Sequence, residues 1–182
     1  MANEKILVLG GAKSGKTDFA LRLGESIGTK IGKVGLYIAT AQALDQEMEE
    51  RISRHKEARS EYWQTMEEPF KVWKAIKAAK SEVGVILVDC LTLWLSNVLA
   101  SPVMEYEECA KRLIEALDQT PKSVIMVSNE VGLGIVPAIK EARQFRDTAG
   151  ELHQKIAQKC DKAFFTIAGM AIELKGAAFT YG

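Results

Sequence analysis

Eight residues close to the N-terminus have the types and spacing of a phosphate-binding loop. Residues 10–17 are Gly-Gly-Ala-Lys-Ser-Gly-Lys-Thr, which matches the pattern G-x-x-x-x-G-K-[ST]. The glycines of such a loop let backbone N–H groups turn toward phosphate oxygens, and the helix that follows adds the positive end of its dipole. We therefore predict that Lys16 contacts the β- and γ-phosphates of a nucleotide and that the Thr17 hydroxyl binds Mg²⁺.

A candidate carboxylate for the same Mg²⁺ ion follows the most uniformly apolar run of the chain. Residues 83–88 are Val-Gly-Val-Ile-Leu-Val, and Asp89 comes next. Nucleotide-binding proteins with this loop use an acidic residue at a neighbouring strand end to hold the Mg²⁺ shell. The alternative is that Asp89 caps the helix that follows it, and one carboxylate can serve both purposes.

The chain has two histidines, and one of them lies in a pattern that suggests chemistry. His55 falls in a charged helix expected over residues 44–60, on the same side as an apolar stripe. This stripe consists of Leu44, Met48 and Ile52. The adjacent cations Lys56 and Arg59 disfavour protonation of the imidazole and keep a nucleophilic nitrogen available. From spacing alone a structural role for His55 is the favoured interpretation, and we also expect a structural role for His153.

The elements that would position these residues are short apolar strands alternating with amphipathic helices. Uniformly apolar strands are typical of a parallel sheet that is covered on both faces. The expected strands cover residues 5–9, 34–39, 62–66, 83–88 and 123–127, and a closing hairpin over 163–168 and 171–174 turns at Gly169. This order predicts a three-layer α/β fold with a mostly parallel central sheet and a C-terminal antiparallel hairpin, in one domain over residues 1–182.

Composition narrows the classes of protein and partner. Lysine plus arginine total 24 and aspartate plus glutamate total 24, a balance that argues against a nucleic-acid-binding surface. The three cysteines form no C-x-x-C pair, which fits a reducing compartment better than a disulfide framework. No stretch approaches the ~20 apolar residues that span a bilayer, and the apolar run before Gly10 is shorter than the signal-peptide core of about 7–15 residues. We expect a cytoplasmic protein without a membrane span.

Four blocks of the sequence, taken together, resemble one known enzyme family. They are the loop over residues 10–17, residues 37–40 with the helix of His55, the strand end over 88–92, and residues 127–137 continued by 142–150. From about residue 6 to 175 the chain resembles the bifunctional adenosylcobinamide kinase / adenosylcobinamide-phosphate guanylyltransferases of cobalamin biosynthesis. The phosphate loop is common to many families, whereas the other three blocks in this order are far more specific.

The resemblance implies a P-loop NTPase fold and two reactions. Family members phosphorylate adenosylcobinamide with ATP or GTP and then transfer GMP from GTP, through a guanylylated histidine, to give adenosylcobinamide-GDP. That histidine corresponds to His55, which makes it the implied nucleophile, with Lys16 as the second catalytic residue. The resemblance also implies GTP, ATP and Mg²⁺ as ligands, a corrinoid substrate and a homotrimer. The implied nucleotide contacts are Gly10, Gly11, Ala12, Lys13, Ser14, Gly15, Lys16, Thr17, Ala39, Thr40, Ala41, Lys56, Arg59, Glu67 and Asp89.

Several alternatives stay open at this point. A plain P-loop small-molecule kinase with a structural His55, or a nucleotide-gated binding module, also fits the phosphate loop. Asn129 and Glu130 follow a strand, where α/β sheets place ligands, so we expect them beside the phosphates or the corrinoid unless they only cap the loop. The remaining candidates, which would hold either the substrate or a neighbouring subunit, are Arg143, Arg146 and Asp147.

Overall fold

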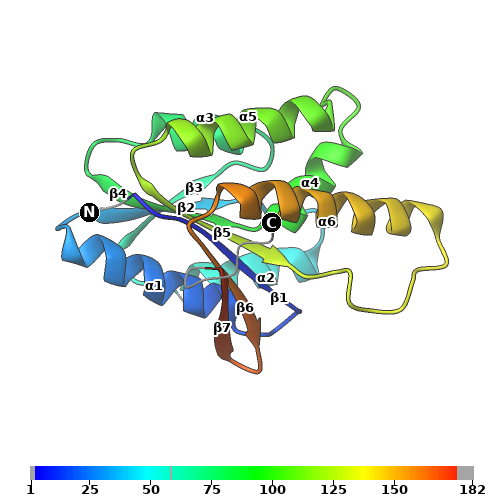
Figure 1. Ribbon diagram of the computed structural model, residues 1–182, viewed down its shortest axis with the longest axis horizontal. Coiled ribbons are helices and arrows are strands. Elements are labelled where there is room, and N and C mark those ends of the chain that lie inside the picture. The colour runs from blue at the N-terminus through cyan, green and yellow to red at the C-terminus, as the bar shows by residue number, and fades with distance from the viewer. Residues whose placement is uncertain (1–2, 58, 176–182) are drawn as a thin grey trace.

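The computed structural model describes residues 3–57 and 59–175, without the side chains of Arg51 and His55. In this part of the chain the strands form one sheet in the order β3-β2-β4-β5-β1-β6-β7 (Figure 1). All neighbouring strands are parallel except β7, which runs antiparallel to β6. The strands are β1 (Lys5–Gly10), β2 (Val34–Ala39), β3 (Trp63–Glu67), β4 (Val83–Asp89), β5 (Ser123–Asn129), β6 (Lys162–Ile167) and β7 (Met170–Lys175). The helices are α1 (Lys16–Lys30), α2 (Gln46–Glu57), α3 (Val72–Ala78), α4 (Leu91–Ala100), α5 (Tyr106–Gln119) and α6 (Lys140–Lys159).

Helices cover both faces of the sheet. On one face Leu21 of α1 packs in a buried cluster with Val8 of β1. On the other face lie α3, α4, α5 and α6 (Figure 1), where Trp94, Leu113 and Leu152 are fully buried. Because β4 and β5 are enclosed between two helical layers, their sequences are apolar without alternation. The predicted three-layer α/β fold with a C-terminal hairpin is confirmed.

The parallel strands end at one edge of the sheet, and their register aligns the residues that finish them. Gly10 of β1 pairs with Asn129 of β5. Ala39 of β2 pairs with Asp89 of β4 on one side and with Glu67 of β3 on the other. Ligands of α/β sheets bind outside the carboxyl ends of the strands. The topology therefore gathers at one edge five strand ends that are far apart in the sequence.

Both expected boundaries of one helix are wrong. The helix predicted over residues 44–60 runs from Gln46 to Glu57 as α2, and Leu44 is 81% exposed. The reason for the later start is Asp45, whose Oδ1 accepts the Met48 N–H at 2.8 Å. A carboxylate that binds an N–H group of the first turn caps a helix, so α2 can start only after Asp45. The apolar stripe of this helix therefore lacks Leu44 and retains Met48 and Ile52.

No helix in residues 3–57 and 59–175 is both long enough and apolar enough to cross a bilayer. The thiols of Cys90, Cys109 and Cys160 are buried and form no disulfide. Burial raises the pKa of Cys90 to about 11 and that of Cys160 to about 12. Since the thiolate is the reactive form of cysteine, these two side chains are inert at neutral pH.

Candidate active site

The phosphate loop has the tight conformation that its sequence motif predicts. Gly15, the residue before α1, has a φ of +91°, a left-handed conformation that glycine adopts at little cost. At Gly10 a Cβ atom would lie 2.2 Å from the Thr166 hydroxyl oxygen, so only glycine fits. The Lys16 Nζ donates to the Gly11 carbonyl at 2.9 Å. These contacts fold residues 10–16 into a compact turn between β1 and α1.

The β6–β7 hairpin is hydrogen-bonded to the phosphate loop and supports it. The Gly169 N–H, in the hairpin turn, donates to the Ser14 carbonyl at 3.0 Å. The Ser14 and Thr166 hydroxyl oxygens lie 2.7 Å apart, and Thr166 donates to the Leu9 carbonyl at 3.1 Å. The hairpin was predicted from the sequence, but this contact was not, because residues 152 positions apart leave no local pattern.

Asp89 accepts two hydrogen bonds at the end of β4. Thr17 Oγ1 donates to Oδ2 at 3.0 Å, and Tyr37 Oη donates to the same oxygen at 2.7 Å. Burial, and then the charge of Asp89, raises the pKa of Tyr37 far above its usual range, so the phenol remains a donor. The predicted pair of Thr17 and Asp89 is thus assembled. Tyr37 belongs to the block over residues 37–40, but no role was assigned to it; the available signal was a lone polar side chain in the apolar strand β2.

Thr17 and Asp89 fit the ligand chemistry of Mg²⁺. A hydroxyl and a carboxylate are hard oxygen donors, and Mg²⁺ usually binds through one or two protein ligands together with substrate phosphates. In the described part of the chain, no group of three or more His, Cys, Asp or Glu side chains converges to hold a metal ion. Thr17 and Asp89 are therefore the two side chains that could hold Mg²⁺ together with nucleotide phosphates.

A second set of charged side chains faces the loop from α2 and β3. Lys56 Nζ lies 2.6 Å from Glu67 Oε1, and this hydrogen bond and the lysine charge lower the pKa of Glu67. The central carbon of the Arg59 guanidinium lies 3.6 Å from the centroid of the Tyr37 ring, where the ring face attracts a cation. Arg59 Nη1 also donates to Thr65 Oγ1 at 3.0 Å. Each of these two cations is thereby held by neighbouring side chains.

These groups line one cavity of about 900 Å³, a volume within the range of roughly 300–1,000 Å³ that is typical of ligand pockets. Met48 and Ile52 of α2 add an apolar wall, and Asn129 lines the cavity from the end of β5. The predicted site residues that line it are Lys13, Ser14, Gly15, Lys16, Thr17, Ala39, Ala41, Lys56, Arg59, Glu67 and Asp89. The structure therefore brings together residues from four separate sequence blocks.

Four of the predicted nucleotide contacts do not line the cavity, namely Gly10, Gly11, Ala12 and Thr40. Thr40 is fully buried. Its hydroxyl donates to the Cys90 carbonyl at 2.8 Å and accepts the Cys90 N–H at 2.7 Å. Asn97 Nδ2 donates to the Thr40 carbonyl at 2.8 Å. The Thr40 side chain thus ties the end of β2 to the residue that follows β4.

The two histidines lie in different parts of the fold. Position 55 is in α2, three residues after Ile52 and next to Lys56, both of which line the cavity. The side chain of His55 lies outside the described residues. His153 of α6 is buried, with Nε2 2.7 Å from Ser128 Oγ, and burial lowers the pKa of its imidazole. This environment agrees with the structural role predicted for His153.

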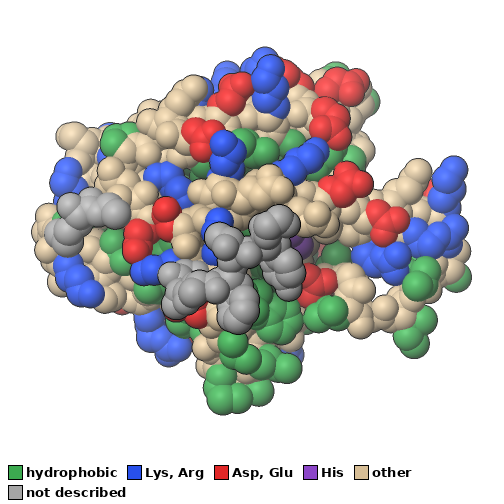
Figure 2. All heavy atoms as spheres, in the orientation of Figure 1, with side chains coloured by type: hydrophobic (Ala, Val, Ile, Leu, Met, Phe, Trp, Pro, Cys, Tyr) green, Lys and Arg blue, Asp and Glu red, His purple; other side chains and the backbone are tan. Residues whose placement is uncertain are grey.

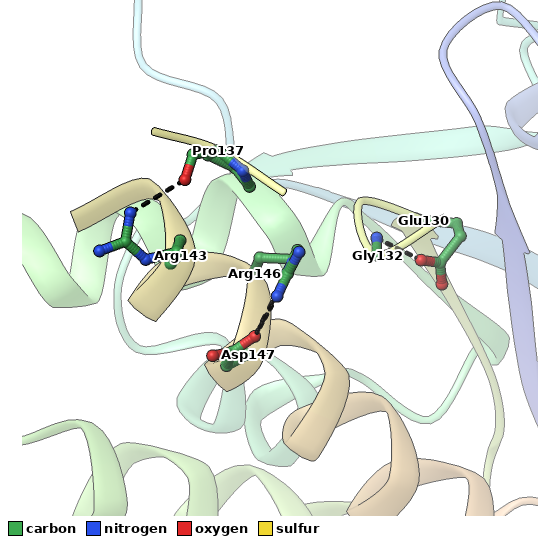
Figure 3. A network of polar contacts seen from close by, with 6 residues as sticks. All are labelled: Glu130, Gly132, Pro137, Arg143, Arg146 and Asp147. Atoms are coloured by element: carbon green, nitrogen blue, oxygen red, sulfur yellow. Dashed lines mark hydrogen bonds and ion pairs between the residues drawn. The ribbon is translucent and has the colours of Figure 1, made fainter. Parts of the chain in front are cut away.

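The two polar residues at the end of β5, Asn129 and Glu130, have different surroundings. Asn129 lines the cavity and its Nδ2 donates to Thr92 Oγ1 at 3.0 Å. Glu130 does not line the cavity, and its Oε1 accepts the N–H of Gly132 at 2.5 Å (Figure 3). For Glu130 the structure favours the loop-capping alternative.

The two arginines in the first two turns of α6 make polar contacts with residues close to them in the sequence. Arg143 Nη1 donates to the Pro137 carbonyl at 3.0 Å, and Arg146 pairs with Asp147 at 3.1 Å (Figure 3). None of these three charged residues lines the cavity. The loop that Arg143 braces carries four exposed apolar side chains, Leu133, Ile135, Val136 and Ile139.

Comparison with known proteins identifies the family. The family model described as "Cobinamide kinase / cobinamide phosphate guanyltransferase" matches residues 6–174. The chain belongs to this family. A relative from Pseudomonas aeruginosa, "Bifunctional adenosylcobalamin biosynthesis protein CobP", is 43% identical over 171 residues, which cover 93% of this chain and 96% of the relative. The "Bifunctional adenosylcobalamin biosynthesis protein CobU" of Escherichia coli is 36% identical over 185 residues, with coverage of 93% and 99%. The resemblance found in the four sequence blocks is confirmed.

Solved structures of other families share the fold of this cobinamide kinase / guanyltransferase family member. The flagellar accessory protein FlaH of Methanocaldococcus jannaschii superposes with a TM-score of 0.56 at 15% identity, covering 96% of this chain and 79% of FlaH. The RadB recombinase superposes with a TM-score of 0.52 at 15% identity, covering 90% and 74%. At this level of identity the likeness concerns the fold alone, which is that of P-loop NTPases, as predicted.

Proposed function

We propose that this protein catalyses two reactions. It phosphorylates adenosylcobinamide with ATP or GTP, and it then transfers GMP from GTP to the product, which gives adenosylcobinamide-GDP. The observation that carries this proposal is one cavity with cations on two separate elements. Lys16 belongs to the phosphate loop, whereas Lys56 belongs to α2 and Arg59 follows it. Cations from separate elements that line one cavity suit a triphosphate whose γ-phosphorus reacts in one step and whose α-phosphorus reacts in another.

In the kinase step, a hydroxyl oxygen of adenosylcobinamide attacks the γ-phosphorus, and the bond from that phosphorus to the β–γ bridging oxygen breaks. The nucleoside diphosphate leaves, and the hydroxyl proton passes to water. Phosphoryl transfer of this kind depends mainly on positioning and on stabilising the developing charge. Lys16, which is 9% exposed, supplies a positive charge beside the γ-phosphate. Mg²⁺ held by Thr17 and Asp89 would neutralise charge on the β- and γ-phosphates.

In the guanylyltransferase step we assign His55 as the nucleophile. An imidazole nitrogen bonds to the α-phosphorus of GTP, and pyrophosphate leaves. A phosphate oxygen of adenosylcobinamide phosphate then attacks the same phosphorus, and the P–N bond breaks to regenerate the histidine. A covalent intermediate divides one difficult displacement into two easier ones. Lys56 and Arg59, which line the cavity close to position 55, supply positive charge to the leaving pyrophosphate.

Guanylylation of the purified protein tests this proposal. Incubation with GTP and Mg²⁺ should attach one guanylyl group, and peptide mapping by mass spectrometry should locate it on His55. His55→Asn should lose the label. His153→Gln, a change at the second histidine, should keep it, because His153 does not line the cavity.

The other outcomes distinguish the rival functions. Kinase activity without any guanylylation would indicate a plain P-loop small-molecule kinase with a structural His55. Nucleotide binding without transfer to a corrinoid, even at excess substrate, would indicate a nucleotide-gated binding module. A label that persists in His55→Asn would show that the nucleophile is another residue.

We further propose that the protein is a cytoplasmic homotrimer, with residues 1–182 as a single nucleotide-binding domain. Buried thiols without disulfides suit a reducing compartment. Figure 2 shows apolar side chains gathered over the β6–β7 hairpin, where four of them are more than half exposed. These are Ile167, Met170, Ile172 and Leu174. Exposed apolar patches are typical of contact surfaces, and sedimentation equilibrium would distinguish a trimer from a monomer.

A further inference from the structure

The side chain of Tyr37 contacts two charged residues of the proposed nucleotide site, Asp89 and Arg59. It is the only polar residue of β2, and it is 2% exposed. We propose that Tyr37 is a positioning residue, whose hydroxyl holds the Asp89 carboxylate and whose ring holds the Arg59 guanidinium. This inference rests on the proposed function, and it deepens that function by assigning two tasks to separable parts of one residue.

The hydroxyl of Tyr37 fixes the carboxylate that is proposed to hold Mg²⁺. Its 2.7 Å hydrogen bond to Asp89 Oδ2 is shorter than the 3.0 Å bond from Thr17 to the same oxygen. Two donors on one oxygen restrict rotation of the carboxylate. Hydrogen bonds to an ionised acceptor are about twice as strong as those between neutral groups, and partners behind a metal ligand typically change metal affinity by roughly 10–100-fold. Loss of this hydroxyl should therefore weaken the binding of Mg²⁺.

The ring of Tyr37 holds the guanidinium of Arg59. The central carbon of the Arg59 guanidinium lies over the ring, 3.6 Å from its centroid. Its Nε is buried and has no hydrogen-bond partner among the described residues. The Tyr37 ring and the hydrogen bond to Thr65 Oγ1 thus set the position of the Arg59 side chain. Removal of the ring should release Arg59, whereas removal of the hydroxyl alone should not.

The sheet makes Tyr37 a rigid support. Its strand is paired on both sides, so that Tyr37 lies between Leu87 of β4 and Thr65 of β3. Trp63 meets the ring edge-on, with centroids 6.5 Å apart and an interplanar angle of 82°. A side chain locked by packing on a strand that is paired on both sides holds its contacts more precisely than one on a loop. Tyr37 therefore sets the spacing between the two charged groups.

Two substitutions separate these tasks. Binding of GTP is measured by calorimetry, first in EDTA and then as a function of Mg²⁺ concentration. Tyr37→Phe should raise the Mg²⁺ midpoint by about tenfold or more and leave the affinity in EDTA within about twofold, because the ring remains. Tyr37→Leu should raise the midpoint and also weaken binding in EDTA by roughly threefold to tenfold, as expected for a lost cation–π contact.

Tyr106→Phe is the matched control. The Tyr106 hydroxyl is buried without a hydrogen-bond partner among the described residues, and Tyr106 does not line the cavity. Its loss should change neither quantity. Thermal unfolding and circular dichroism show which variants are folded at the temperature of the binding measurement. The conservative Tyr37→Phe variant retains the buried ring and so remains informative if Tyr37→Leu fails to fold.

A double-mutant cycle with Asp89→Asn tests whether the Tyr37 hydroxyl acts through Asp89 or has only a structural role. If the hydroxyl acts through Asp89, Tyr37→Phe should no longer change the Mg²⁺ midpoint in the Asp89→Asn background. Equal effects in both backgrounds would overturn the inference, as would a wild-type midpoint in Tyr37→Phe. A wild-type protein that binds no GTP would refute the proposed function itself. GTP binding by the wild type with an unchanged midpoint in Tyr37→Phe would overturn only the role of Tyr37.

Discussion

Replacement of Lys16 by methionine is the most direct test of the phosphate loop. Methionine keeps a long side chain and removes one positive charge from a site that is 9% exposed. Two unit charges about 4 Å apart attract by about 4 kcal/mol at an effective dielectric constant of about 20. Since about 1.4 kcal/mol corresponds to a tenfold change in rate, this predicts a loss of up to about 10³-fold. Removal of one donor to a developing oxyanion independently costs roughly 10²–10³-fold. We therefore expect kcat/KM of the kinase step to fall by about 10²–10³-fold.

The assay measures release of nucleoside diphosphate with adenosylcobinamide as the acceptor. Lys77→Met is the matched control, because Lys77 is an exposed residue of α3 that does not line the cavity. Thermal unfolding should show that Lys16→Met remains folded. If its kcat/KM stays within about threefold of the wild-type value, which is under 1 kcal/mol, the assignment of residues 10–17 as the phosphate loop is refuted.

Two further predictions concern stability. A Cβ at Gly24 would lie 2.6 Å from the Trp63 ring. Gly24→Ala should therefore destabilise the fold by about 1–3 kcal/mol and lower Tm by roughly 2–12 °C. A rise in Tm would show that helix propensity outweighs packing. Burial lowers the pKa of His153, so the unfolded state binds more protons and stability should rise with pH up to about 6.5. Denaturant titrations should show this rise in the wild type and a smaller one in His153→Gln; equal slopes would contradict it.

Local sequence patterns predicted most of the fold. The apolar runs of β1, β2, β4 and β5 indicated buried parallel strands because residues enclosed between two helical layers need no polar face. The glycine in the turn predicted the hairpin of β6 and β7. The start of α2 was misplaced because the apolar spacing continued back to Leu44, whereas capping by Asp45 determined where the helix began.

The candidate site was predicted in part. Lys16, Thr17 and Asp89 were expected to act together, and the observed contact between Thr17 and Asp89 agrees with that expectation. Thr40 was expected to contact the nucleotide; this stays a prediction, and the structure shows that its hydroxyl bonds to the Cys90 backbone. Both orientations are compatible with the same sequence, because a threonine at a strand end can face either side depending on its neighbours.

The sequence by itself determined the phosphate loop, the alternation of strands and helices, and the membership of the family, since each depends on residue types at short or fixed spacing. Only the tertiary structure decided which distant groups meet. The contacts of Tyr37 with Asp89 and Arg59, and the support of Ser14 by Thr166, follow from the order and register of the strands. Strand order is set by packing of the whole chain, and no short segment encodes it.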